Sequence, residues 1–179
     1  MPYVDEGAFR YRFPDSWIAV KFDESTFYSN HFQDFAGGTK AVDVVAYEPD
    51  SRTLWLIEAK DYRQHQREKK LSVGRELAEK ARGTLACLMA GRANAGETGN
   101  LNTDSLWGSA VLLLKIRFIF HLEQPTTHSR LFPQSIDPKI VKDILARSIR
   151  AVDQHPVGGG YSEINRRTDL GWRIESVTI

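Results

Sequence analysis

Residues 41–60 read AVDVVAYEPDSRTLWLIEAK, and this stretch decides the fold. It holds two short apolar runs, at 41–47 and 53–59, that are rich in Val, Leu, Ile or Trp. Between them, residues 48–52 (EPDSR) have the composition of a turn. Apolar residues occupy both alternating faces of each run, which is typical of strands covered on both sides. The stretch therefore predicts a buried β-hairpin.

The register of this hairpin follows from the length of its turn. A four-residue loop at 49–52 pairs Glu48 with Thr53, and the residue numbers of every further pair then sum to 101. Asp43 is thereby placed directly opposite Glu58. Lys60 lies two residues beyond Glu58, so it shares the same face, roughly 6–7 Å along the strand.

Two facing carboxylates at the end of a buried sheet are unfavourable. Like charges opposite each other destabilise a strand pair by up to about 1 kcal/mol, and burial adds to the cost. We therefore expect one of the two acids to titrate above its ordinary pKa. A divalent cation between them would remove the repulsion, and hard oxygen ligands suit Mg²⁺, for which Mn²⁺ can substitute. The ammonium of Lys60 could hold a phosphate and orient or deprotonate the attacking water.

Asp43 followed by Glu58-Ala59-Lys60 at the end of the next apolar strand resembles the PD-(D/E)xK nuclease superfamily. The resemblance implies Asp43, Glu58 and Lys60 as catalytic residues. Asp43, Glu58 and the Ala59 carbonyl would be the metal ligands, with Lys60 on the phosphate side. Val42 precedes Asp43 at a position where the family pattern has proline.

The same resemblance implies a restriction-endonuclease-like fold with an αβββαβ core, in which helices flank a mixed central sheet. It also implies a further acid on an upstream helix, for which Glu24 is the best candidate and Glu6 the next. The whole chain, 1–179, is predicted to be one α/β domain. Its core would span about 20–122, with residues 137–179 packed on it.

The remaining elements follow from periodicity and from turn residues. Residues 24–35 have helical spacing, with a strand as the alternative, and 92–104 predict a loop. The other expected elements are strands within 9–22 that break at Pro14, a helix over 73–90, a strand over 116–122, a helix from Asp137 to about 152 and a strand over 172–179.

The two longer helices each have an expected buried face. On 73–90 it comprises Leu77, Ala81, Thr84, Leu85, Leu88 and Met89. On the helix after Asp137 it comprises Ile140, Val141, Ile144, Leu145 and Ile149. Glu76 and Lys80 have the spacing of a favourable i,i+4 pair.

A basic stretch follows the second strand of the hairpin. It predicts a nucleic-acid contact surface, with a solvated linker as the alternative. Its members are Arg63, Arg67, Lys69 and Lys70, together with Arg75. The five histidines show no metal-ligand spacing, and Cys87 lies among apolar residues as a buried thiol would.

Composition limits the classes of protein to consider. The 179 residues are 41% hydrophobic and 26% charged, as in an ordinary globular protein, and the net charge of +1 shows no bulk preference for polyanions. No apolar run approaches the roughly 18 residues of a membrane span, and the polar, acidic N-terminus does not resemble a signal peptide. A single cysteine permits no internal disulfide. A cytoplasmic protein is expected.

These features predict a magnesium-dependent endonuclease or phosphodiesterase. It would hydrolyse nucleic acid with a metal-activated water, and DNA is favoured over RNA because most members of the resembled fold cut DNA. The alternative is a nucleic-acid-binding or assembly module of a defence or repair complex, without turnover of its own. No membrane partner is expected, and a homodimer or a larger complex stays open.

Overall fold

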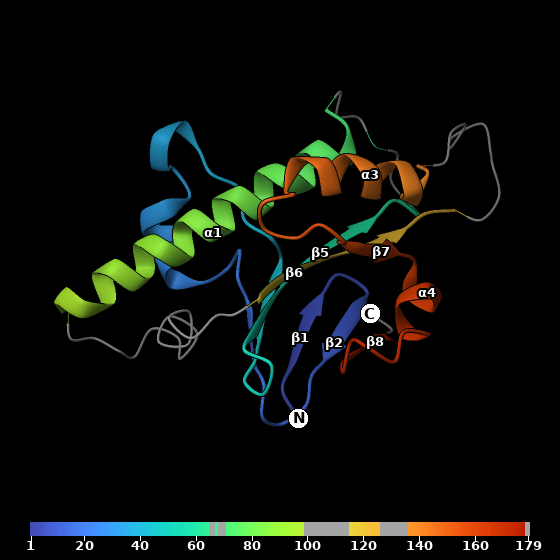
Figure 1. Cartoon of the computed structure of the whole chain (residues 1–179), viewed down its shortest axis with the longest axis horizontal. Coiled ribbons are helices and arrows are strands. Elements are labelled where there is room, and N and C mark those ends of the chain that lie inside the picture. The colour runs from blue at the N-terminus through green and yellow to red at the C-terminus, as the bar shows by residue number, and fades with distance from the viewer. Residues whose placement is uncertain (65–66, 68–70, 99–114, 126–135, 178–179) are drawn as a thin grey trace.

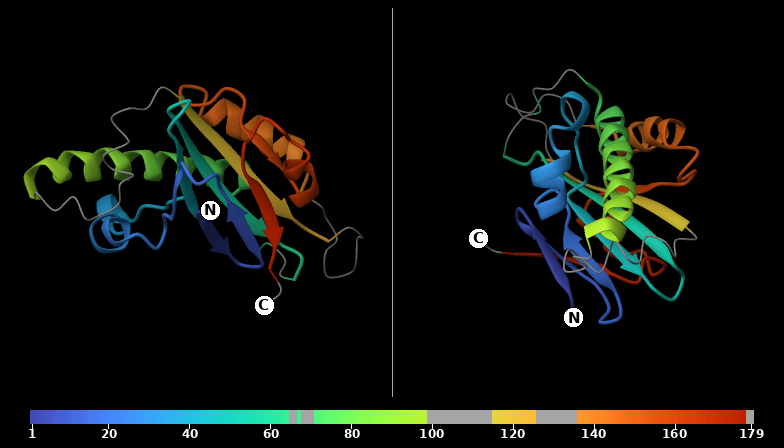
Figure 2. Two further views of the ribbon diagram at one scale, coloured as in Figure 1. Left: turned by 90° about the horizontal axis from the view of Figure 1, so that it is seen from below. Right: turned by 90° about the vertical axis from the view of Figure 1, so that its left-hand side faces the viewer.

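The computed structural model describes residues 1–64, 67, 71–98, 115–125 and 136–177. They form a mixed α/β structure in three layers (Figures 1 and 2). A five-stranded sheet lies in the middle, helices α1 (Val73–Thr98) and α3 (Pro138–Ser148) cover one face, and a three-stranded sheet covers the other. In this described part no helix is both long enough and apolar enough to cross a membrane.

The central sheet has the strand order β3-β4-β5-β6-β7. The first three strands are antiparallel, whereas β6 is parallel to β5 and β7 is parallel to β6. Their bounds are β3 (Ile18–Lys21), β4 (Val44–Glu48), β5 (Thr53–Asp61), β6 (Lys115–Glu123) and β7 (Val157–Gly159). The mixed α/β class and the strand expected at 116–122 are thus confirmed.

The β4–β5 hairpin has the register expected from its turn. Glu48 pairs with Thr53, and Val44 pairs with Ile57. The turn closes through a 3.2 Å hydrogen bond from the Arg52 N–H to the Pro49 carbonyl, with Arg52 at a φ of 51°. Side chains from both faces of the hairpin are buried, in two separate clusters. The hairpin is therefore a covered one, and no bulge shifts its pairing.

Helix α1 connects β5 to β6 and packs on the central sheet. Its buried stripe is confirmed at Leu77, Ala81, Thr84 and Leu88. Met89 was expected to be buried, but 71% of it is exposed, because it continues the row of the half-buried Leu85 along the flank of the helix. The loop expected from residue 92 is also wrong as far as 98, where the helix ends; residues 99–104 lie outside the described part.

Helix α3 begins at the predicted cap. The Asp137 carboxylate accepts a 2.8 Å hydrogen bond from the Lys139 N–H, and Pro138 occupies the first turn. Val141 and Leu145 are buried as expected, whereas Ile140 is 58% exposed because it lies on the outer side of the helix. The helix ends at Ser148, a few residues before the expected end.

A second sheet, which the sequence did not predict, covers the other face. Its order is β1-β2-β8, all antiparallel: β1 (Tyr3–Glu6), β2 (Phe9–Arg12) and β8 (Arg173–Ser176). The strand expected near the C-terminus therefore exists, but it pairs with β2. A short helix, α4 (Tyr161–Asn165), packs beside β8.

Residues 26–37 are helical but irregular. They contain a π-helical turn at Tyr28–Phe32 and a 3₁₀ turn at Phe35–Gly37. The positive φ of Gly37 and Gly38 ends the segment just after the predicted range of 24–35. It lies between β3 and β4. The first helix of the expected αβββαβ order has no counterpart in residues 1–17, all described, which form β1 and β2 instead.

Candidate active site

The candidate site lies where β4 begins and β5 ends. Asp43 immediately precedes β4 and is buried. Its backbone carbonyl accepts a 2.8 Å hydrogen bond from the Phe22 N–H, which ties it to the end of β3. Its Oδ2 accepts a 2.7 Å hydrogen bond from the Ala59 N–H on β5. The carboxylate is therefore held by two neighbouring strands.

Glu58 is the most enclosed charged group of the site, with no solvent exposure. Burial and the nearby charge of Asp43 raise its pKa to about 7, against the opposing effect of two lysines. The Oε1 atom of Glu58 lies 2.5 Å from the Nζ atoms of both Lys60 and Lys80. Its Oε2 atom is buried and makes no hydrogen bond within the described residues. The raised pKa agrees with the expectation for facing carboxylates.

Lys60 lies on the same face of β5 as Glu58, as predicted. Its Nζ atom is also 3.5 Å from Oε1 of Glu76, a buried acid on the first turn of α1. Burial lowers the pKa of Lys60, but the Glu58 charge outweighs this and the pKa is raised overall. The lysine therefore stays charged beside the acids.

Lys80 belongs to this cluster, although the sequence predicted it only as a partner of Glu76. From α1, its Nζ atom reaches 3.0 Å from Asp43 Oδ1 as well as 2.5 Å from Glu58 Oε1. Burial opposes its charge, but the two carboxylates raise its pKa well above the ordinary value. The position, three residues after the buried Leu77, was the available signal for an inward-facing lysine.

The predicted upstream acid, Glu24, lies at the surface. Its side chain is 67% exposed and pairs with Lys21 at 2.6 Å. Its neighbour Asp23 is half-buried, and the Asp43 charge adds to burial in raising its pKa to about 6. The buried Oδ1 atom of Asp23 has no hydrogen-bond partner among the described residues. Asp23, and not Glu24, is thus the upstream acid that the Asp43 charge affects.

Glu6, the second candidate, lies on the opposite side of the hairpin end. It pairs with Lys21 at 3.1 Å and lines a small cavity of about 50 Å³ with Ala59, Lys60 and His121. Within the described ranges, no three His, Cys, Asp or Glu side chains gather closely enough to hold a metal by themselves. A metal at this site would therefore need water, backbone or substrate oxygens besides the carboxylates.

The predicted basic strip is only partly a surface. Arg67 is 13% exposed and contacts Glu76 at 2.7 Å, the Tyr62 hydroxyl at 2.8 Å and the Leu71 carbonyl. Arg63 is more exposed and pairs with Asp61 at 2.6 Å. Arg75 is exposed on α1. Lys69 and Lys70 lie outside the described residues.

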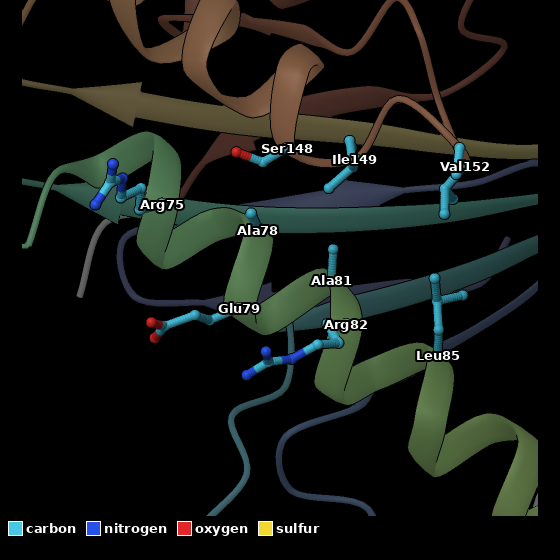
Figure 3. A pocket seen from close by; sticks show the side chains of 10 residues that line it. Arg75, Ala78, Glu79, Ala81, Arg82, Leu85, Ser148, Ile149 and Val152 are labelled. Carbon is cyan, nitrogen blue, oxygen red and sulfur yellow. The ribbon is translucent and has the colours of Figure 1, made fainter.

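A separate cavity of about 520 Å³ lies between α1 and the end of α3 (Figure 3). Ala78, Ala81, Leu85 and Ile149 form its apolar floor, and Arg75 and Arg82 stand at its edge. None of the acids at the hairpin end lines it, so it does not belong to the candidate site.

His121 and Cys87, which the sequence did not assign to the site, are both buried. His121 is 1% exposed, and its Nδ1 lies 2.8 Å from the Tyr11 hydroxyl while its Nε2 lies 3.0 Å from Glu123. Cys87 is buried on α1, and burial raises the pKa of its thiol to about 12, so it is not a reactive thiolate.

Comparison with known proteins finds one partial relative and no matching family. No family model and no solved structure matches the chain. A cysteine–tRNA ligase of Neisseria meningitidis is 26% identical to this chain, and the match covers 80% of this chain. The chain spans about a quarter of the length of that protein, 24%. The similarity is too low and too partial to assign a family.

Proposed function

We propose that the chain is a metal-dependent nuclease related to the PD-(D/E)xK superfamily, hydrolysing phosphodiester bonds in nucleic acid, with DNA as the favoured substrate. The observation that carries the proposal is the meeting of Asp43 and Glu58 at one cation. Both carboxylates contact the Lys80 ammonium, at 3.0 and 2.5 Å, and Lys60 lies beside them. A pair of buried acids held this way is arranged to bind positive charge.

The residues present fit a magnesium ion. The ligands would be the carboxylates of Asp43 and Glu58, with the Ala59 carbonyl as a third oxygen. Mg²⁺ binds proteins through one or two carboxylates and keeps several waters, so a set of this size suffices. The buried Oε2 atom of Glu58, which has no partner in the described residues, is an oxygen that such an ion would satisfy. When bound, the ion would supply a nucleophilic water and charge stabilisation at phosphorus.

The chain's own groups would divide the remaining work. Lys60 would bind a non-bridging phosphate oxygen, since its ammonium lies beside Glu58 and retains its charge. Asp23 would help to orient water, because its carboxyl adjoins Asp43 and has a pKa near 6. The exposed Arg63 would contact the nucleic-acid backbone.

The element order supports the same proposal. Three antiparallel strands, β3-β4-β5, are followed by α1 and then by the parallel strand β6. This order agrees with the last five elements of the αβββαβ core that the resemblance implies. In such a core the acids lie at the end of the hairpin, where Asp43 and Glu58 lie here.

A nucleic-acid-binding module without turnover is the second candidate function. It is favoured by one observation: Lys80 contacts both acids and, together with Lys60, can balance their charge. The name of the partial relative refers to a tRNA ligase, which makes RNA worth including among the substrates tested.

The deciding experiment is incubation with linear, nicked, branched and single-stranded DNA and with RNA, in Mg²⁺ or Mn²⁺. The proposal expects metal-dependent cleavage that Asp43→Asn, Glu58→Gln and Lys60→Ala each abolish. Asp143→Asn, at an exposed acid on α3, is the matched control and should cleave normally. Cleavage that persists in Glu58→Gln would reject this site, and binding without cleavage in the unaltered protein would favour the second function.

A further inference from the structure

Lys80 occupies the position between the two proposed metal ligands. Its ammonium contacts Asp43 Oδ1 and Glu58 Oε1 at once, and its side chain is 15% exposed. An ammonium cannot coordinate a metal, because it has no lone pair. A divalent cation and the Lys80 ammonium therefore cannot both lie between these carboxylates.

Among the two acids and two lysines in direct contact, the charges balance only while Lys80 is in place. When both acids are ionised, Asp43 and Glu58 carry two negative charges, and Lys60 and Lys80 carry two positive ones. Asp23, whose charge also acts on Asp43, lies outside this set. Next to them, the Glu76 carboxylate contacts the guanidinium of Arg67 at 2.7 Å, which adds one charge of each sign. Introducing a divalent cation leaves an excess of two positive charges, and a low-dielectric setting makes such an excess costly.

The backbone of α1 cannot move away to relieve this excess. The Thr84 hydroxyl donates to the Lys80 carbonyl at 2.8 Å and accepts from the Val42 N–H at 2.9 Å. At Gly83 the helix backbone lies so close to Lys40 that a Cβ would come within 2.1 Å of its carbonyl oxygen. The helix is thus fixed to the segment that carries Asp43, and only the Lys80 side chain, with its flexible stem, is free to leave.

We propose that Lys80 is a resident cation that a divalent metal must displace, and that the displaced ammonium then binds the nucleic-acid phosphate. This inference rests on the proposed function and extends it. Lys80 lowers the affinity of the free protein for metal and raises the affinity of the metal-loaded protein for nucleic acid. Metal and nucleic acid therefore bind cooperatively, and the coupling is reciprocal.

The first test is calorimetric titration with Mn²⁺, without nucleic acid, of the unaltered protein, Lys80→Met and Lys80→Arg. Lys80→Met should bind Mn²⁺ at least tenfold more tightly than the unaltered protein, whereas Lys80→Arg, which keeps the charge, should not. Arg82→Met is the control: it removes an exposed positive charge from the same helix, at the edge of the cavity in Figure 3, and should leave the affinity unchanged. Thermal unfolding verifies that each variant is folded. If Lys80→Met does not fold, Lys80→Arg still tests the proposal, because tighter Mn²⁺ binding by Lys80→Arg would contradict it.

The second test measures binding of a mixed-sequence DNA duplex by anisotropy, in EDTA and in Ca²⁺. Lys80→Met should weaken binding several-fold in Ca²⁺ and leave it unchanged in EDTA, where Lys80 is held by the acids.

Equal Mn²⁺ affinities of the unaltered protein and Lys80→Met would overturn the exchange and leave the nuclease proposal standing. Lack of Mn²⁺ binding by all variants would instead overturn the metal site, and with it the proposed function.

Discussion

Glu58 is the most buried residue of the candidate site, and it lies beside another acid and two lysines. Its pKa of about 7 means that the folded protein holds a proton there that the unfolded chain releases near pH 4.5. The folded state therefore binds more protons between these pH values, and the free energy of unfolding falls as pH rises through this window. The loss is nearly complete about one pH unit above this pKa.

Glu58→Gln removes this titration. Relative to the Gln variant, the unaltered protein should lose about 3 kcal/mol of stability between pH 4.5 and 7.5 in metal-free buffer. Urea denaturation at several pH values measures it, and the contribution of Asp23, common to both proteins, cancels in the difference. Parallel stability curves for the two proteins would show that Glu58 titrates normally.

Asp23 and Glu24 are adjacent in sequence but differ in setting, which makes them a matched pair. Asp23 is half-buried, and the Asp43 charge raises its pKa. Glu24 is exposed and forms an ion pair with Lys21. Asp23→Asn should reduce cleavage by about 10²-fold or more, the usual range for a group that assists proton transfer, and Glu24→Gln should have little effect. Single-turnover cleavage rates decide between them, and the reverse order would restore Glu24 as the upstream acid.

At this scale the sequence predicted the acids that lie on one hairpin, since Asp43, Glu58 and Lys60 follow from register and alternation alone. It did not predict Lys80 or Asp23. Lys80 lies on α1, which packs on the face of the central sheet. The spacing of Lys80 from Glu76 suggested a surface ion pair instead. Asp23 lies just after β3, where its approach to Asp43 depends on a backbone hydrogen bond from Phe22. Contacts of these kinds have no local pattern.

Among the elements, α1 is positioned by an unusually close approach. Gly83 packs against the backbone at Lys40, and any side chain there would overlap the carbonyl oxygen. Gly83→Ala gains about 1 kcal/mol of helix propensity but should destabilise the protein by about 1–3 kcal/mol net, because the helix must shift outward.

The same shift should weaken the contact of Lys80 with Asp43, so Gly83→Ala should also alter Mn²⁺ affinity. Ala86→Gly, at an exposed position of α1, is the control: it should lose about 1 kcal/mol through propensity alone and bind Mn²⁺ normally. Chemical denaturation and calorimetry measure both. A stabilised Gly83→Ala protein would show that the helix can move freely.

The elements with their own local signals were predictable. The β4–β5 hairpin, α1, β6 and α3 each had periodicity together with turn or cap residues. Strands were also predicted at β2 and β8, but their pairing with β1 into a separate small sheet was not, because these strands are only four residues each and β8 joins from the far end of the chain. Pairing over such a distance depends on the packed sheets themselves. The length of α1 was also underestimated, since the Gly and Asn residues near its end suggest a loop.

For the whole molecule, the two sheets are joined by a buried polar contact as well as by apolar packing. The Tyr11 hydroxyl of β2 donates to Nδ1 of His121 on β6, and Nε2 of His121 donates to Glu123. Tyr11→Phe leaves the His121 nitrogen unsatisfied and should destabilise the protein by about 1–3 kcal/mol. Cleavage and Mn²⁺ affinity should stay unchanged when measured below the unfolding temperature; a loss of either would place this contact within the site.

The hairpin that brings Asp43 and Glu58 together also sets an order of events as the chain folds. The two acids are only 15 positions apart in the sequence, so they should approach each other as soon as β4 and β5 pair. We expect Lys80 to join them later, because α1 must first dock on the central sheet. Until then the carboxylates of Asp43 and Glu58 repel each other at the open end of the hairpin. The β4–β5 pairs next to them should therefore form only after α1 has docked. A growing chain that ends before α1 thus has the two acids close together without the lysine that joins them in the folded protein.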